Sequence, residues 1–177
     1  MTDSPRLDDK YVDKLDDAYS APAPHTDEEI RRLVRLAVSR KAHSVIIGHG
    51  SDPAATAAAR AFADAWRNHG GVILDAVRWA ERGASWLGPA RILTAVEPDL
   101  WVLGGAPAGL AQMIRRLIWS TQWQPNRTIG FASASSSTMH QLAHGDNLEG
   151  LIGATSDGGT WGMVNHTYTE LPAEDQP

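Results

Sequence analysis

The stretch VIIGHGSDPAAT, residues 45–56, predicts a buried strand that ends in a polar, glycine-containing turn and passes at once into a helix. Residues 44–48 are a short β-branched run, which is typical of a strand covered on both faces. Asp52 can cap the helix, with Pro53 at its first position, where a backbone N–H is not needed. A strand that leads directly into a helix is the basic unit of a parallel α/β sheet.

The same alternation continues along the chain. Thr26 and Glu29 form a capping box, in which a hydroxyl and a carboxylate satisfy backbone N–H groups, before a helix with one apolar face. Further strands are predicted at residues 71–77, 99–105, 127–133 and 148–155, and further helices at 88–96, 107–120 and 137–144. This order predicts an α/β fold: a three-layer, open, mainly parallel sheet of about five strands, with helices on both faces.

Length and composition fit one domain with loose ends. The chain has 177 residues, of which 42% are hydrophobic and 21% charged, enough to bury a full core. We assign residues 26–170 to a single α/β domain. Residues 1–25 carry alternating Asp and Lys followed by SAPAPH, a composition too polar and proline-rich to pack, which predicts a flexible leader. Residues 171–177 are expected to form a flexible tail.

Charge and cysteine content exclude several classes of function. The formal net charge is −5 and the basic residues are scattered, so the sequence lacks the basic surface that nucleic-acid binding requires. The absence of cysteine excludes disulfides, thiolate nucleophiles and zinc–thiolate sites. The N-terminus is polar and no apolar run is long enough to span a bilayer. We therefore expect a cytoplasmic chain with no membrane partner.

Five segments follow the predicted strands: 49–52, 78–86, 104–106, 133–137 and 156–157. Ligands of open parallel sheets bind outside the carboxyl ends of the strands, so these segments are candidates for a binding site. Four of the five are small, polar and glycine-rich, which suits backbone N–H groups directed at ligand oxygens. The alternative is that such turns favour Gly, Ser and Asp for their conformation alone.

Two stretches resemble a known family. EPDLWVLGGAPAGLAQMIRRL, residues 97–117, and LEGLIGAT, residues 148–155, are similar to one lobe of the leucine/isoleucine/valine-type periplasmic binding proteins, the type I fold. The resemblance covers residues 27–155 and implies ligand contacts in the loops after the first four strands. The residues at the matching positions are His49, Ser51, Asp52, Ser85, Trp86, Gly105, Ala106, Ser133 and Ser135.

In this family a second lobe completes the ligand site, and a single lobe offers only one wall of the cleft. The resemblance therefore implies a non-catalytic ligand-sensing or protein-interaction module, without a cofactor or a resident metal. Its expected partners are a small polar molecule or another protein, including a second copy of the chain.

A chelatase-like enzyme is the alternative. IIGHGSDP, residues 46–53, is similar to the turn after the first strand of the sirohydrochlorin and cobalt chelatases, in which a histidine binds the metal. His49 would then be a metal ligand and general base, since neutral imidazole suits both tasks. The spacing is one residue short, however, and no second histidine directly follows a predicted strand: the candidates are His140, His144 and His166.

The tryptophans divide into two predicted groups. Trp66, Trp101 and Trp119 lie on core-facing patterns. Four others fall in or near predicted loops: Trp79, Trp86, Trp123 and Trp161. Trp79 and Trp86 flank a polar segment beside the predicted cleft, where an exposed indole would stack on a ligand or anchor an interface. Exposed aromatic side chains of this kind predict a homo-oligomer or docking on another protein.

Overall fold

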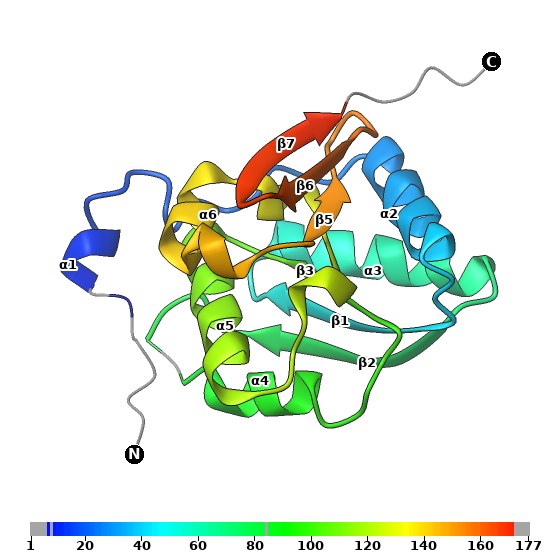
Figure 1. Cartoon of the computed structure of the whole chain (residues 1–177), viewed down its shortest axis with the longest axis horizontal. Coiled ribbons are helices and arrows are strands. Elements are labelled where there is room, and N and C mark those ends of the chain that lie inside the picture. Colours follow the sequence, from blue (N-terminus) through cyan, green and yellow to red (C-terminus); the bar gives the residue numbers. More distant parts are fainter. Residues whose placement is uncertain (1–6, 8, 84, 172–177) are drawn as a thin grey trace.

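Figure 1 shows a computed structural model of the chain, which describes residues 7, 9–83 and 85–171. These residues form a seven-stranded sheet in the order β2-β1-β3-β4-β5-β6-β7. The strands are β1 (Ser44–Gly50), β2 (Val72–Trp79), β3 (Leu100–Gly104), β4 (Thr128–Gly130), β5 (Ile152–Ala154), β6 (Thr160–Val164) and β7 (Thr167–Leu171). The predicted α/β fold is confirmed, and β1–β5 pair in parallel as expected.

The antiparallel hairpin β6–β7 extends the parallel sheet beyond the predicted five strands. Its two-residue turn places Asn165 and His166 at positive φ, 51° and 60°. Glu149 holds the turn, because its two carboxylate oxygens accept hydrogen bonds from the backbone N–H groups of Asn165 and His166 at 3.1 and 2.9 Å. This hairpin was not predicted from the sequence.

Helices cover both faces of the sheet (Figure 1). The helices are α1 (Asp9–Val12), α2 (Asp27–Ser39), α3 (Pro53–Asn68), α4 (Leu87–Leu93), α5 (Pro107–Ser120) and α6 (Ser137–Ala143). Short 3-10 turns, η1 (Pro125–Arg127), η2 (Ala132–Ser135) and η3 (Gly145–Asn147), connect them to the strands. One core lies between the sheet and α2 and α3, and the other lies between the sheet and α4, α5 and α6.

Local signals place the helices beside the central strand as predicted. The Thr26 hydroxyl accepts a hydrogen bond from the Glu29 N–H at 3.1 Å and caps α2. Asp52 Oδ1 accepts from the Ala55 N–H at 2.8 Å and caps α3, which begins at Pro53. Because β1 lies between β2 and β3 and under helices on both faces, its residues 45–50 are all buried.

The segment before α2 packs against the domain. Val12 and Ala18 are buried at 1% and 0% exposure in the core on the α5 side. The Ala108 N–H donates to the Ala18 carbonyl at 2.7 Å, and the Thr138 hydroxyl bonds to the Asp17 carboxylate at 2.7 Å. The expectation that this segment is too polar to pack is therefore wrong for its described residues. We call residues 13–25 the strap.

Some expectations for the termini lie outside the described residues. These are the leader at residues 1–6 and 8, and the tail at 172–177. Within the described ranges, none of the helices combines the length and the apolar character that crossing a bilayer requires.

Most of the tryptophans lie in environments that differ from the prediction. Trp66 and Trp101 are buried as expected. The four that we placed in or near loops are buried at 0–7% exposure: Trp79, Trp86, Trp123 and Trp161. Trp119, which we placed in the core, is 58% exposed. The inward stripe of α5 runs through Leu110, Met113, Ile114 and Leu117, and Trp119 lies off this stripe.

Candidate functional site

A cavity of about 410 Å³ lies at the carboxyl ends of β3, β4 and β5, between the start of α3 and the strap. Its lining includes Ala54, Ala55 and Ala58 of α3, Gly104 and Gly105 after β3, Phe131, Ala132, Ser133, Ser135 and Ser136 after β4, and Thr155 and Ser156 after β5. Residues 20–25 of the strap supply another wall. We call this space the strap cavity. Its position is the edge of the sheet at which the sequence predicted a ligand site.

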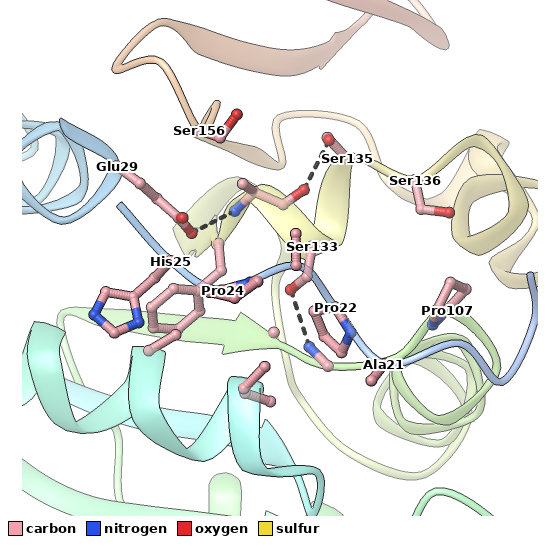
Figure 2. A pocket seen from close by; sticks show the side chains of 18 of the residues that line it. Ala21, Pro22, Pro24, His25, Glu29, Pro107, Ser133, Ser135, Ser136 and Ser156 are labelled. Carbon is pink, nitrogen blue, oxygen red and sulfur yellow. Dashed lines mark hydrogen bonds between the residues drawn. The ribbon is translucent and has the colours of Figure 1, made fainter. Parts of the chain in front are cut away.

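Glu29 brings a buried carboxyl group to the strap cavity from the first turn of α2 (Figure 2). The side chain is almost fully buried, with 3% exposure, and its Oε1 accepts a hydrogen bond from the Ala132 N–H at 2.8 Å. Burial raises the pKa of Glu29 above its usual range, and hydrogen bonds from Ala132 and Thr26 and the nearby His25 offset part of this increase. The carboxyl group thus ties α2 to the turn after β4.

Three serines follow β4 and differ in what they can offer a ligand. Ser133 Oγ accepts a hydrogen bond from the Gly105 N–H at 3.2 Å, and Ser136 Oγ accepts from the Met139 N–H at 3.3 Å. Both hydroxyl protons can therefore be donated to another acceptor. Ser135 instead donates its proton to the Ala132 carbonyl at 2.8 Å (Figure 2).

The strap closes the cavity with small and proline residues. Figure 2 shows Ala21, Pro22, Pro24 and His25 following one another along the side of the cavity beside Ser133 and Glu29. The proline rings restrict the backbone to extended conformations, which suits a wall without secondary structure. His25 Nδ1 is buried and has no hydrogen-bond partner among the described residues.

A pair of acidic groups lies outside the strap cavity, just after the ends of β1 and β2. Asp52 Oδ2 and both carboxyl oxygens of Glu81 are buried without a hydrogen bond of normal geometry in the described part of the chain. Burial and the neighbouring Asp52 carboxylate raise the pKa of Glu81 to about 7. Gly50 and Gly109 leave the space for this group, since a Cβ on either would lie 1.7 or 1.8 Å from a Glu81 oxygen.

The structure brings together only part of the predicted site. Three of the nine residues line the strap cavity: Gly105, Ser133 and Ser135. Ala106 is buried at the start of α5 and does not line it. Ser51 is exposed in the turn after β1, and Asp52 caps α3.

The other three predicted residues lie elsewhere. Ser85 is exposed, and its hydroxyl accepts a long hydrogen bond of 3.4 Å from the Leu87 N–H. Trp86 is buried in the core on the α4 side, which corrects the prediction of an exposed indole. His49 lines a separate cavity between α3 and β2.

Sequence reasoning missed Glu29, His25 and the rest of the strap. Glu29 was interpreted only as half of a capping box, and the strap was interpreted as a leader. The small residues Ala54, Ala55 and Ala58, spaced along one side of α3, are the signal that something approaches this helix closely.

The histidines do not assemble a metal site. No group of three or more His, Asp or Glu residues in the described ranges is arranged to hold a metal ion. A ring nitrogen of His140, Nε2, donates to the Ala134 carbonyl at 2.9 Å, and the ring packs against both Trp161 and Tyr168. His140 is thus part of the core rather than a partner for His49.

Several solved structures of ligand-binding proteins have a fold similar to that of this chain. An extracellular ligand-binding receptor from Rhodopseudomonas palustris matches with a TM-score of 0.64 and 20% identity, over 78% of this chain and 36% of that one. A substrate-binding periplasmic protein from Ralstonia solanacearum matches with a TM-score of 0.63 and 16% identity, over 78% and 39%. A branched-chain amino acid transporter substrate-binding protein from Streptococcus pneumoniae, in complex with isoleucine, matches with a TM-score of 0.58 and 11% identity, over 71% and 34%.

The matched region spans little more than a third of the length of these proteins. No protein-family model and no curated protein matches the chain. The resemblance inferred from the sequence is confirmed as a likeness of fold: the chain has the fold of one lobe of a type I periplasmic binding protein.

Proposed function

We propose that the chain binds one small polar molecule in the strap cavity and releases it unchanged. The observation that carries this proposal is the position of a cavity of about 410 Å³ at the carboxyl ends of β3–β5. Open α/β sheets bind ligands at this edge, and pockets for small molecules usually measure about 300–1,000 Å³. The strap adds a wall that a bare sheet edge would lack.

The polar groups of the cavity favour a zwitterion such as a free α-amino acid. The Glu29 carboxylate suits a ligand ammonium group, because a buried charge gains most from an opposite charge. The hydroxyl protons of Ser133 and Ser136 suit a ligand carboxylate. Three of the similar structures are named as branched-chain amino acid transporter proteins, one of them only provisionally, and another holds isoleucine.

Isothermal titration calorimetry with a panel of free amino acids tests this proposal. We expect at least one amino acid to bind, and Glu29→Gln to weaken its binding by roughly tenfold to a hundredfold, the usual effect of a hydrogen bond to a charged group. Glu28→Gln is the matched control, because Glu28 lies exposed on the same turn of α2 and pairs with Arg31 at 2.7 Å. Binding that is unchanged in Glu29→Gln, or no binding by any amino acid, would contradict the proposal.

We also propose that the domain docks on a second copy of itself through β2 and α4. This region carries exposed apolar side chains on adjacent elements: Val72 and Leu74 of β2, Ile92 of α4, and Val96 just after α4. β2 is an edge strand, so its outer backbone groups have no partner strand in the sheet.

A further inference from the structure

A second cavity, of about 420 Å³, lies between α3 and the edge strand β2. It shares α3 with the strap cavity, but residues from different sides of the helix line the two spaces. We call it the α3–β2 cavity. Its floor is apolar and small, formed by Ile47, Ala59, Ala63 and Ala76. The floor of the cavity therefore carries no acidic group.

His49 places one nitrogen in this cavity. The imidazole is 8% exposed, and its Nδ1–H donates to the Gly50 carbonyl at 2.7 Å. This bond fixes the tautomer, so Nε2 is the nitrogen left without a hydrogen-bond partner among the described residues. Burial lowers the pKa of His49, and the positive charges of Arg78 and Arg60 lower it further, against opposing effects of Gly50 and Asp52.

Two arginines reach the same space from opposite walls. Arg78 lies on β2 directly beside His49 in the strand register, and Arg60 lies on α3. Neither guanidinium group has a hydrogen bond or an ion pair with any residue that the structure describes. The acidic residue of the lining, Asp64, pairs instead with Arg67 at 3.5 Å. The cavity therefore carries two positive charges without an internal counterion.

We propose that the α3–β2 cavity binds an anionic oxygen group, a phosphate or a carboxylate of a small molecule, between Arg60 and Arg78 with His49 as a third contact. Guanidinium groups bind such oxygens through paired N–H donors. A bound anion also stabilises the imidazolium form of His49, whose Nε2–H then donates to the ligand. This site is formed by other residues than the strap cavity and does not rest on the function proposed for that cavity.

Calorimetric titration of the full chain with sulfate and inorganic phosphate, and separately with acetate and succinate, tests the site. Saturable binding of either pair supports it, and the pair that binds more tightly identifies the group. We expect Arg60→Gln and Arg78→Gln each to weaken binding by about tenfold or more. Arg91→Gln is the matched control, because Arg91 is an exposed arginine on α4, across the sheet, and should leave the affinity within about twofold.

Sulfate keeps its charge between pH 6 and pH 8, as do the arginines. Glu81, which lies beside Gly50 and Asp52, also titrates in this range, so His49 accounts only for the part of the pH dependence that His49→Asn removes. We expect affinity to rise as the pH falls through this range in the original chain and to rise less in His49→Asn. The proposal would be overturned if none of the four anions binds, or if Arg91→Gln weakens binding as much as Arg60→Gln and Arg78→Gln do. A pH dependence that persists unchanged in His49→Asn would remove His49 from the site.

Discussion

At the residue scale, Glu81 shows how a carboxyl group can be held neutral near physiological pH. The group lies between two glycines and beside Asp52, and burial together with this neighbour raises the pKa of Glu81 to about 7. In the unfolded chain the same group ionises near its ordinary pKa of 4.5. The folded state therefore holds a proton that the unfolded state has lost across this interval.

Glu81 consequently makes the domain less stable as the pH rises. The stabilisation that the folded state gains by holding the Glu81 proton is fully present below about pH 4.5. It is lost as the pH rises through about 7, because ionised Glu81 is favoured only in the unfolded state. Glu81→Gln should be more stable than the original chain at pH 8 by about 1–2 kcal/mol, a value reduced to allow for solvent screening. The advantage should shrink towards pH 5.

Urea unfolding of both proteins at pH 5 and pH 8 measures this difference. Asp146→Asn provides the control, because Asp146 is exposed on η3. Its substitution should change the free energy of unfolding by the same amount at both pH values. An equal stability of Glu81→Gln and the original chain at pH 8 would show that Glu81 is not held in an unfavourable ionised state.

Single residues also show how far the sequence could define the site. Ser133, Ser135 and Gly105 line the strap cavity because turns after parallel strands meet at one edge, while their role as ligand contacts stays a prediction. Glu29 could not be predicted in this role, since its hydrogen-bond partner Ala132 lies 103 residues away. Local patterns report capping and turns, but they do not report which distant turn a carboxylate reaches.

At the scale of elements, the strap is the segment whose structure departs most from its composition. Its polar residues suggested a chain without packing, yet buried Ala18 and partly buried Leu15 attach it to the core, together with buried Val12 at the end of α1 just before it. Their spacing places one apolar residue about every three positions. Two further contacts hold it, the Thr138–Asp17 hydrogen bond and the Arg82 guanidinium 3.5 Å from the Tyr19 ring centre.

Asp17→Asn should loosen the strap. The change weakens the hydrogen bond that the Thr138 hydroxyl donates at 2.7 Å, because a neutral amide oxygen is a poorer acceptor than a carboxylate. We expect the Ala108 N–H, which bonds to the Ala18 carbonyl, to exchange with deuterium roughly three- to tenfold faster. Hydrogen exchange measured on peptides spanning residues 106–110 would detect this change.

Asp16→Asn is the matched control, since Asp16 is the exposed neighbour of Asp17. Exchange at Ala108 that responds equally to both substitutions, or to neither, would show that the carboxylate of Asp17 does not hold the strap.

Other elements followed from local patterns to different degrees. The strand β1 and helix α3 were predicted from a β-branched run, a cap and a proline, all of which act within a few residues. The hairpin β6–β7 was missed because its turn residues, Asn165 and His166, lack the glycine that usually marks such turns. Trp86 was misplaced because its burial depends on tertiary packing: it caps α4 and lies in the same core as Trp79 of β2 and Leu93 of α4.

At the scale of the whole molecule, β2 leaves one side of the sheet open. Val72 and Leu74 are 53% and 43% exposed on this strand, and Ile92 of α4 is 49% exposed nearby. Apolar side chains beside unpaired strand edges favour association with another chain. The surface on which we expected self-association is therefore not formed by Trp86 and Trp123, which are buried.

Leu74→Lys should reduce self-association. A lysine on an edge strand opposes pairing through its charge, and Leu74 is exposed enough that folding should change by less than about 1 kcal/mol. Light scattering over a range of protein concentrations should show a rising mean mass for the original chain and a constant, monomeric mass for the variant. Val164→Lys, at an exposed position on β6, is the control. A monomeric original chain at every concentration would contradict the expectation.

Helix α3 forms a wall of both cavities, with Ala55 and Ala58 on one side and Ala59 and Arg60 on the other. Two ligands that touch one rigid element are thermodynamically linked whenever either of them shifts it. If an anion beside Arg60 changes the affinity of the strap cavity by some factor, the small polar molecule must change the affinity for the anion by the same factor. The domain would then act as a reciprocal sensor, in which each ligand reports the concentration of the other.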